Sequence, residues 1–203
     1  MAILRAMFGP SKEEIWRQLS AEIGAQYVAG GFWRGDRVQA RHKEWTVTLD
    51  IYTVSTGHAH VQYTRLRAPY VNADGFRFLV YRAGIFSELG RRLGMQDVEI
   101  GREDFDRDFV IKGNDEARLN WFFSNEKIRA LLQAQPDVRF EVVDDEGWFG
   151  ADFPQGVDEL RFQVRGVIKD LDRLKQLFEL FAATLDELCA MGSAYLNRPD
   201  VEL

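Results

Sequence analysis

The stretch Leu171–Ala190, LDRLKQLFELFAATLDELCA, carries the longest helical pattern in the sequence. Its large apolar residues recur three or four positions apart, which places them on one face of a helix. These residues are Leu171, Leu174, Leu177, Phe178, Phe181, Leu185 and Leu188. Asp170 can cap the start of this helix and Gly192 can end it. An isolated helix is only marginally stable in water, so we expect this face to be buried against a sheet.

An amino-terminal helix is predicted by local signals alone. Ser11 and Glu14 have the spacing of a capping box, in which each side chain bonds the backbone N–H near the other. Apolar residues then recur at every fourth position to Ile23, and Gly24 is a plausible stop.

A pair of shorter helices is predicted in the middle of the chain. Asn114 or Asp115 can cap a helix that includes residues 117–122. After a short break at Ser124, a second apolar stripe occupies positions 128, 131 and 132, and Pro136 ends it.

Alternation of apolar and polar residues predicts antiparallel strands between these helices. The alternating segments are residues 38–40, 45–51, 76–80, 138–142 and 160–164, and residues 98–111 look extended. A short helix is predicted over residues 85–93, and residues 144–147 are predicted to form a turn. The expected fold class is α+β, an antiparallel sheet or sheets with helices packed on them.

Composition limits the function classes. The sequence has 26 Lys plus Arg against 32 Asp plus Glu, a formal net charge of -6, so we expect no general attraction to nucleic acid. The densest basic pairs, residues 65 with 67 and 91 with 92, are interpreted as solvated surface. Cys189 is the only cysteine, which excludes an intramolecular disulfide. No run of about 18 apolar residues occurs, so we expect no membrane span and a cytoplasmic protein.

The chain is predicted to form a single domain over residues 1–203, because no linker rich in Pro, Gly or Ser divides it. An alternative is two similar halves, about 11–97 and 98–195. Each half would contain a helix followed by a stretch rich in glycine and aromatic residues and then antiparallel strands.

One segment resembles a known family. It runs from Phe105-Asp106-Arg107-Asp108-Phe109-Val110-Ile111 to Asp115, then through Phe123-Ser124 to the paired leucines Leu131 and Leu132. This resembles a bacterial domain of unknown function, in which a Phe-Asp-x-x-Phe-x-Val strand leads to an Asp and a broken helix pair. The similarity covers about residues 98–143 and has Ile111 in place of Val. It implies an α+β fold and no particular activity. The family members typically carry membrane-spanning segments, and this sequence has none.

Three aspartates are the candidates for an enzyme that uses carboxylates. Asp104, Asp106 and Asp108 recur at a spacing of two, which on a strand would place three carboxylates on one face. The preferred interpretation is a solvated face with Phe105 and Phe109 packed inward. The common nucleophile, phosphate-binding and metalloprotease motifs are absent, and no cofactor is expected.

Two aromatic segments are the candidates for a binding surface. Each joins bulky rings to glycines, and exposed rings of this kind anchor partner proteins or ligands. The candidate residues are Phe32, Trp33, Trp148, Phe149 and Phe153. The alternative is that these rings cover the ends of the sheet.

His58 and His60 are the weak candidates for metal ligands. A three-residue loop at positions 55–57 would place Tyr52 opposite His60, with Asp50 diagonal to it as a third ligand. That register would also place Ala59, Val61 and Tyr63 on the apolar face of the hairpin. We expect an ordinary solvated hairpin without a metal.

Three classes of function follow in order of preference. The first is a non-enzymatic binding or protein-interaction domain. The second is a small-ligand or lipid-binding module with a pocket between the sheet and the final helix. The third is the carboxylate-dependent enzyme. The sequence does not indicate an oligomeric state.

Overall fold

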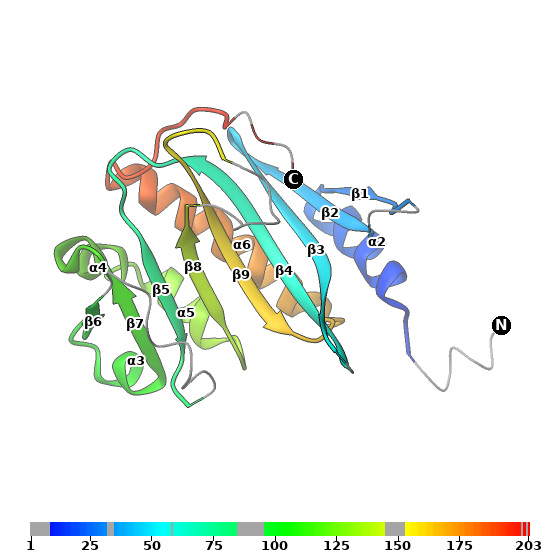
Figure 1. Cartoon of the computed structure of the whole chain (residues 1–203), viewed down its shortest axis with the longest axis horizontal. Coiled ribbons are helices and arrows are strands. Elements are labelled where there is room, and N and C mark those ends of the chain that lie inside the picture. The colour runs from blue at the N-terminus through cyan, green and yellow to red at the C-terminus, as the bar shows by residue number, and fades with distance from the viewer. Residues whose placement is uncertain are drawn as a thin grey trace.

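The computed structural model describes residues 9–31, 35–57, 59–84, 96–144, 153–199, 201 and 203 (Figure 1). The helices are α2 (Lys12–Ile23), α3 (Glu103–Asp108), α4 (Glu116–Phe122), α5 (Glu126–Gln133) and α6 (Leu171–Ala190). The strands are β1 (Gln26–Val28), β2 (Arg37–His42), β3 (Trp45–Thr56), β4 (Ala59–Val71), β5 (Phe78–Arg82), β6 (Gln96–Val98), β7 (Phe109–Gly113), β8 (Arg139–Val143) and β9 (Val157–Arg165).

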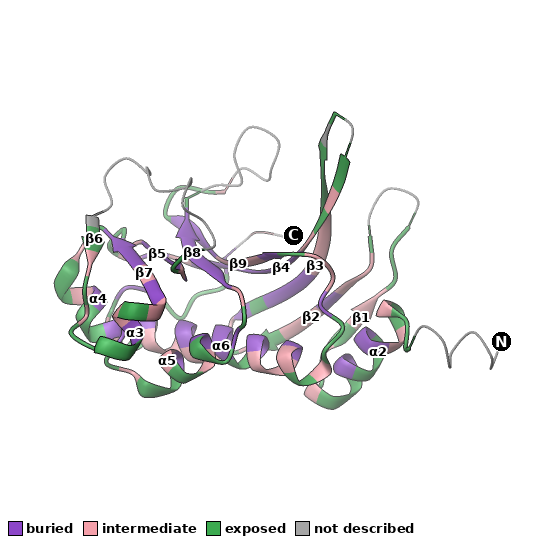
Figure 2. Cartoon of the chain, turned by 90° about the horizontal axis from the view of Figure 1, so that it is seen from below, coloured by how far each residue is buried: buried purple, intermediate pink, exposed green. Residues whose placement is uncertain are grey.

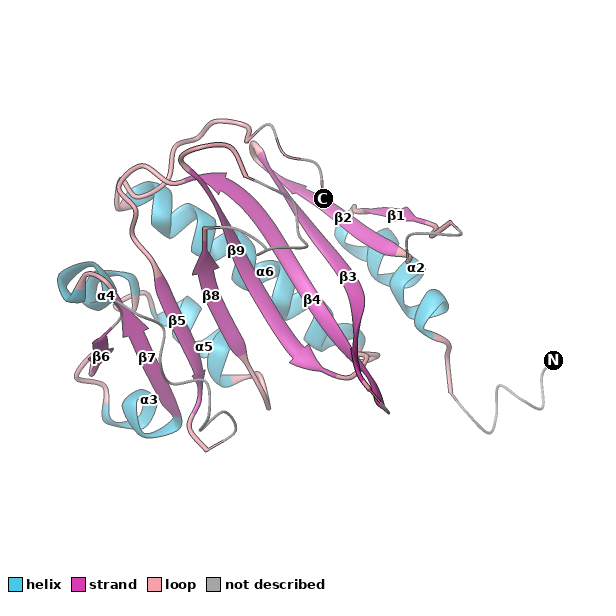
Figure 3. Ribbon diagram, in the orientation of Figure 1, coloured by secondary structure: helices cyan, strands magenta, loops and turns pink. Residues whose placement is uncertain are grey.

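One antiparallel sheet organises the molecule (Figure 3). Its strand order is β1-β2-β3-β4-β9-β8-β5-β7-β6. β9 pairs with β4, and β5 lies between β8 and β7. Strands from the two proposed halves are therefore interleaved in one sheet, with β9 and β8 between β4 and β5, and the α+β fold class is confirmed.

The helices lie along one face of the sheet, and both α2 and α5 contact α6 (Figures 1 and 2). The predicted apolar face of α6 is buried: Leu174, Leu177, Phe181, Leu185 and Leu188 are each 0% exposed. Phe181 packs edge-on against Phe140 of β8, with ring centroids 5.5 Å apart. This confirms that the final helix covers the sheet.

Capping residues fix the helix starts where the sequence predicted them. Ser11 and Glu14 form the complete capping box of α2, and Gly24 ends that helix in the left-handed conformation. The Asp115 and Asp170 carboxylates accept backbone hydrogen bonds at the starts of α4 and α6. These caps depend on residues within one turn, which is why sequence alone identifies them.

The extended segment predicted over residues 98–111 is wrong in its middle, where α3 forms. The Asp106 side chain accepts hydrogen bonds from the backbone N–H of Ile100 and of Arg102, which stabilises a turn there instead of a strand. Phe105 and Phe109 are both buried, and their rings stack at 4.4 Å. Their inward packing is confirmed, but they are brought together by a helical turn.

The predicted register of the β3–β4 hairpin is also wrong. The structure pairs Tyr52 with Tyr63 and Thr56 with Ala59, so only two residues separate the strands. Val61 therefore lies on the face opposite to the apolar residues of β3. The residues of β4 that meet the core come later in the strand.

These core residues are Leu66, Ala68 and Tyr70, each 0% exposed. Residues 59–63 lie instead in an arm that projects beyond the sheet (Figure 2). The observed register buries the larger group of apolar residues of β4, namely Leu66, Ala68 and Tyr70. A one-residue slip would turn these side chains away from the core.

The predicted helix over residues 85–93 lies outside the described residues, as does most of the predicted turn at 144–147. Within the described ranges, no helix combines the length and the apolar character that a membrane crossing requires.

Truncation of the α6 face is expected to destabilise the protein strongly. Leu177→Ala and Phe181→Ala should each lower the free energy of unfolding by about 2–5 kcal/mol, because each leaves a cavity in a packed core. Trp121→Ala is the control: this side chain is 58% exposed, and the change should stay within about 0.5 kcal/mol. Urea unfolding followed by circular dichroism measures the three values. Losses below about 1 kcal/mol at both core positions would contradict the packed interface.

Candidate functional site

The sheet face turned away from the helices, here called the polar face, carries charged side chains in its centre. Alternation along each strand sends Leu66 of β4 and Phe162 of β9 into the core and Arg67 and Arg161 to the polar face. Arg67 pairs across the strands with Arg161, yet only 6% of Arg67 is exposed. Burying such charges requires ion pairs and hydrogen bonds.

Two carboxylates each join a pair of these arginines. Arg65 donates two hydrogen bonds of 2.9 Å to the Asp50 carboxylate, and Arg67 donates a third at 2.6 Å. On the other side, Arg139 donates two bonds of 3.0 Å to Glu141, which also accepts from Arg161. Bidentate geometry of this kind is strong and directional.

Glu159 on β9 lacks such partners. It is 0% exposed, and among the described residues neither carboxylate oxygen accepts a hydrogen bond. Its nearest cation is Arg67, with Nη1 3.9 Å from Oε2. Burial raises the pKa of Glu159 from its ordinary 4.5 to about 7, although the positive charges of Arg67 and Arg161 lower it. The side chain is therefore a buried acid that titrates near neutral pH.

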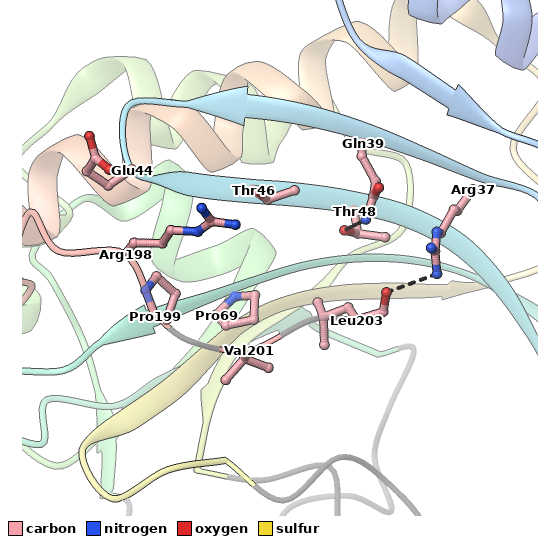
Figure 4. Close-up of a pocket in the computed structure, with 10 residues that line it drawn as sticks. All are labelled: Arg37, Gln39, Glu44, Thr46, Thr48, Pro69, Arg198, Pro199, Val201 and Leu203. Atoms are coloured by element: carbon pink, nitrogen blue, oxygen red, sulfur yellow. Dashed lines mark hydrogen bonds between the residues drawn. The ribbon is translucent and has the colours of Figure 1, made fainter.

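A groove lies beside this cluster, between the sheet and the carboxy-terminal residues (Figure 4). We call it the tail groove, and its volume is about 260 Å³. The lining residues are Arg37, Gln39, Glu44, Thr46, Thr48, Pro69, Arg198, Pro199, Val201 and Leu203. Strands β2, β3 and β4 form its floor, and residues 198–203, here called the tail, supply its wall from the described positions.

Backbone contacts hold the start of this wall. Ala73 N–H donates to the Ser193 carbonyl and Tyr195 N–H donates to the Val71 carbonyl, at 2.9 and 3.1 Å. Further along, Pro199, Val201 and Leu203 line the groove, and Arg37 Nη1 donates to the backbone oxygen of Leu203 at 3.0 Å. Among the described residues, backbone hydrogen bonds thus hold the chain just before the tail, and a side-chain hydrogen bond holds Leu203.

Arg37 also borders a second hollow of about 190 Å³. This hollow is lined by Asp50 and Arg67, so Arg37 lies between the tail groove and the arginine–carboxylate cluster. The Nε atom of Arg37 is buried and has no hydrogen-bond partner in the part of the chain that is described. Arg37 therefore keeps a buried donor beside a polar groove.

The structure separates the metal candidates. Asp50 pairs with Arg65 on the polar face, and His60 pairs with Ser55 on the opposite face of the arm. His58 lies outside the described residues. Across the described ranges, His, Cys, Asp and Glu form no group of three that could hold a metal ion.

The three aspartates of α3 do not form a carboxylate site. Asp106 bonds backbone N–H groups, while Arg107 lies between Asp104 and Asp108, at 3.1 Å from each carboxylate. The predicted strand face with three aligned carboxylates is therefore wrong.

The aromatic candidates are almost entirely outside the described residues. Phe32, Trp33, Trp148 and Phe149 fall there, and Phe153 is half-buried. Their role in binding stays a prediction.

The arginines and carboxylates of the polar face were not predicted as a site from the sequence. Arg65 and Arg67 were predicted to lie on a solvated surface, but both are largely buried in ion pairs. A signal was present: charged residues two apart on strands occur at 65 and 67, at 139 and 141, and at 159 and 161. Three such pairs on adjacent strands indicate a charged stripe, provided that the strand order is known.

Comparisons with known proteins give a fold and no family. No family model matches the chain, and no curated protein matches it. Among solved structures, it is similar to the mycobacterial trehalose monomycolate transport factor A, TtfA. The TM-score is 0.53 and the identity 7%, over 94% of this chain and 98% of that one. A similarity at this identity is evidence for a shared fold alone.

The buried acid predicts a pH dependence of stability. Because the folded-state pKa of Glu159 is raised, its protonated form contributes stability that is fully present below pH 4.5 and is lost as the pH rises through about 7. Between about pH 5 and pH 8, the wild-type free energy of unfolding should fall by on the order of 2 kcal/mol more than that of Glu159→Gln.

Urea unfolding at several pH values measures this difference. Glu126→Gln is the control, because that side chain is 91% exposed, and its profile should follow the wild type. Parallel profiles of wild type and Glu159→Gln would contradict the assignment.

Proposed function

We propose that this chain is a non-enzymatic binding module that holds a polar ligand in the tail groove. One observation carries the proposal: two guanidinium groups, two hydroxyls, an amide and a carboxylate line a groove open to solvent. In ligand-binding sites, a small number of placed polar side chains fix the orientation of the ligand and provide specificity. The second of the three predicted function classes is thus favoured, with a different location for its pocket.

The predicted lipid pocket between the sheet and α6 has no support. Leu174, Leu177 and Phe181 fill that interface and are fully buried. The similarity to TtfA nevertheless favours one variant of the proposal. TtfA is described as a transport factor for trehalose monomycolate, which joins a sugar to an acyl chain. A polar groove suits the sugar part of such a molecule rather than the acyl part.

Support for an enzyme is weaker. The aspartates proposed for it engage Arg107 and backbone N–H groups. Glu159 has the raised pKa that general acids often have, but it is fully buried and does not line the tail groove. Binding of a partner protein by the aromatic segments, the first of the three predicted classes, stays a prediction.

Mass spectrometry of the intact protein under native conditions tests the proposal. Protein purified gently from its bacterial expression host should carry a bound small molecule. Arg37→Gln should lower its occupancy at least about tenfold, because a charge-assisted hydrogen bond contributes about 1.5–3 kcal/mol.

Arg165→Gln is the matched control. This exposed arginine lies at the end of β9 and outside the groove, so the substitution makes the same change in net charge. Retention of the bound molecule in Arg37→Gln, or its loss in both variants, would refute a site in the tail groove.

A further inference from the structure

We propose that the tail groove binds a sugar that carries one carboxylate or phosphate group, with the anionic group at Arg37. This inference rests on the proposed function and names the ligand class for the same groove. The ligand is either a free sugar acid or sugar phosphate, or the headgroup of a glycolipid that carries the same chemistry.

The size of the groove sets the first limit. Its volume of about 260 Å³ lies just below the roughly 300–1,000 Å³ of pockets that hold drug-sized molecules. One sugar ring with a small substituent is therefore the appropriate scale. A long acyl chain would extend beyond the groove.

The lining chemistry selects a hydroxylated molecule. Thr46 and Thr48 present hydroxyls that both donate and accept, and the Gln39 amide adds one acceptor and two donors. The contact from Gln39 Nε2 to Thr48 Oγ1 is long, at 3.4 Å, so a ligand hydroxyl can replace it at little cost. Glu44, at the end of the groove opposite Arg37 in Figure 4, supplies an acceptor.

Apolar atoms complete the fit to a sugar. Pro69, Pro199 and Val201 also line the groove, and both prolines are buried. A sugar ring has hydroxyls around its edge and C–H groups on its faces. A lining that combines hydroxyl and amide groups with proline matches this distribution, whereas an ion alone would make no use of the prolines.

Arg37 places the anionic group. Its Nη1 atom donates to the backbone oxygen of Leu203, its Nε atom is buried away from solvent, and its Nη2 atom has no hydrogen-bond partner among the described residues. A guanidinium group has five N–H donors arranged to grip a carboxylate or phosphate in a bidentate manner. Arg37 therefore has donors left for an anion.

The surrounding charges favour the same group. Asp50, which shares the second hollow with Arg37, already accepts hydrogen bonds from Arg65 and Arg67. Asp36, the other carboxylate there, forms an ion pair with Lys12 at 2.8 Å. Both acids among the described lining residues of the hollow are thus engaged, and a ligand anion would complement the positive charge of Arg37.

Isothermal titration calorimetry tests this ligand class. The probes are glucuronate and glucose 6-phosphate, with glucose as the neutral match. Wild-type protein should bind at least one anionic sugar about tenfold or more tightly than glucose, and added salt should weaken the binding. Arg37→Gln should lose at least about tenfold in affinity, and Arg165→Gln should bind as the wild type does.

A vesicle experiment separates the two sources of the ligand. Phosphatidylcholine vesicles with and without glucuronosyl diacylglycerol are sedimented with the protein. Capture only by the glucuronosyl vesicles indicates a lipid headgroup, whereas binding of free sugars without capture indicates a soluble ligand. Both results support the anionic sugar.

Equal affinity for glucose and the anionic sugars, or no measurable binding of any of them, would overturn the inference. So would wild-type affinity in Arg37→Gln. If thermal melting shows that Arg37→Gln is not folded, Arg198→Gln replaces it. That residue is exposed in the tail, and its loss should weaken binding several-fold. A copurifying molecule that depends on Arg37, without binding of anionic sugars, would refute the ligand class and leave the proposed function standing.

Discussion

The pairing of β4 with β9 is the constraint on which the rest of the structure depends. These strands lie far apart in the sequence, and their antiparallel ladder runs from Thr64–Val164 to Val71–Val157. Its register sends Leu66 and Phe162 together into the core that α6 covers. The same register forces Arg67 and Arg161 to face each other on the other side. A sheet with one apolar and one charged face follows from this single alignment.

Burying charged side chains on the polar face costs free energy, so the buried arginines need carboxylates as partners. Two arginines directly opposite one another repel, so each needs a carboxylate of its own. Asp50 serves Arg67 and Glu141 serves Arg161, both at hydrogen-bonding distance. Among the described residues, Glu159 has only an ion pair of 3.9 Å with Arg67, and burial raises the pKa of this carboxyl to about 7. An acid left in this condition stabilises nothing as a carboxylate, and such local conflicts concentrate near functional sites.

Local features of the fold could be predicted from sequence, and non-local ones could not. The caps at Ser11 and Asp170 and the apolar stripe of α6 involve neighbours within a few residues, so their patterns are visible in the chain. The predicted register of the β3–β4 hairpin was wrong because it relied on the alternation near the turn, whereas the observed register buries Leu66 further along β4. The position of β5 between β7 and β8 depends on which strands pair, and the periodicity of each segment does not determine its partners.

The tail groove could not be predicted from the sequence for the same reason. It forms between strands β2 to β4 and the tail, which are far apart in the sequence. Arg37 and Leu203 are 166 positions apart, and the hydrogen bond between them holds Leu203 in the wall of the groove. Closing a long loop costs little more entropy than closing a short one, because that cost grows only with the logarithm of length. The backbone bonds at Ser193 and Tyr195 already bring the chain to the edge of β4, so the last bond closes only the short remaining segment. Arg37 therefore links two parts of the polar face, because the side chain that holds Leu203 in the wall of the tail groove also borders the hollow beside Asp50 and Arg67.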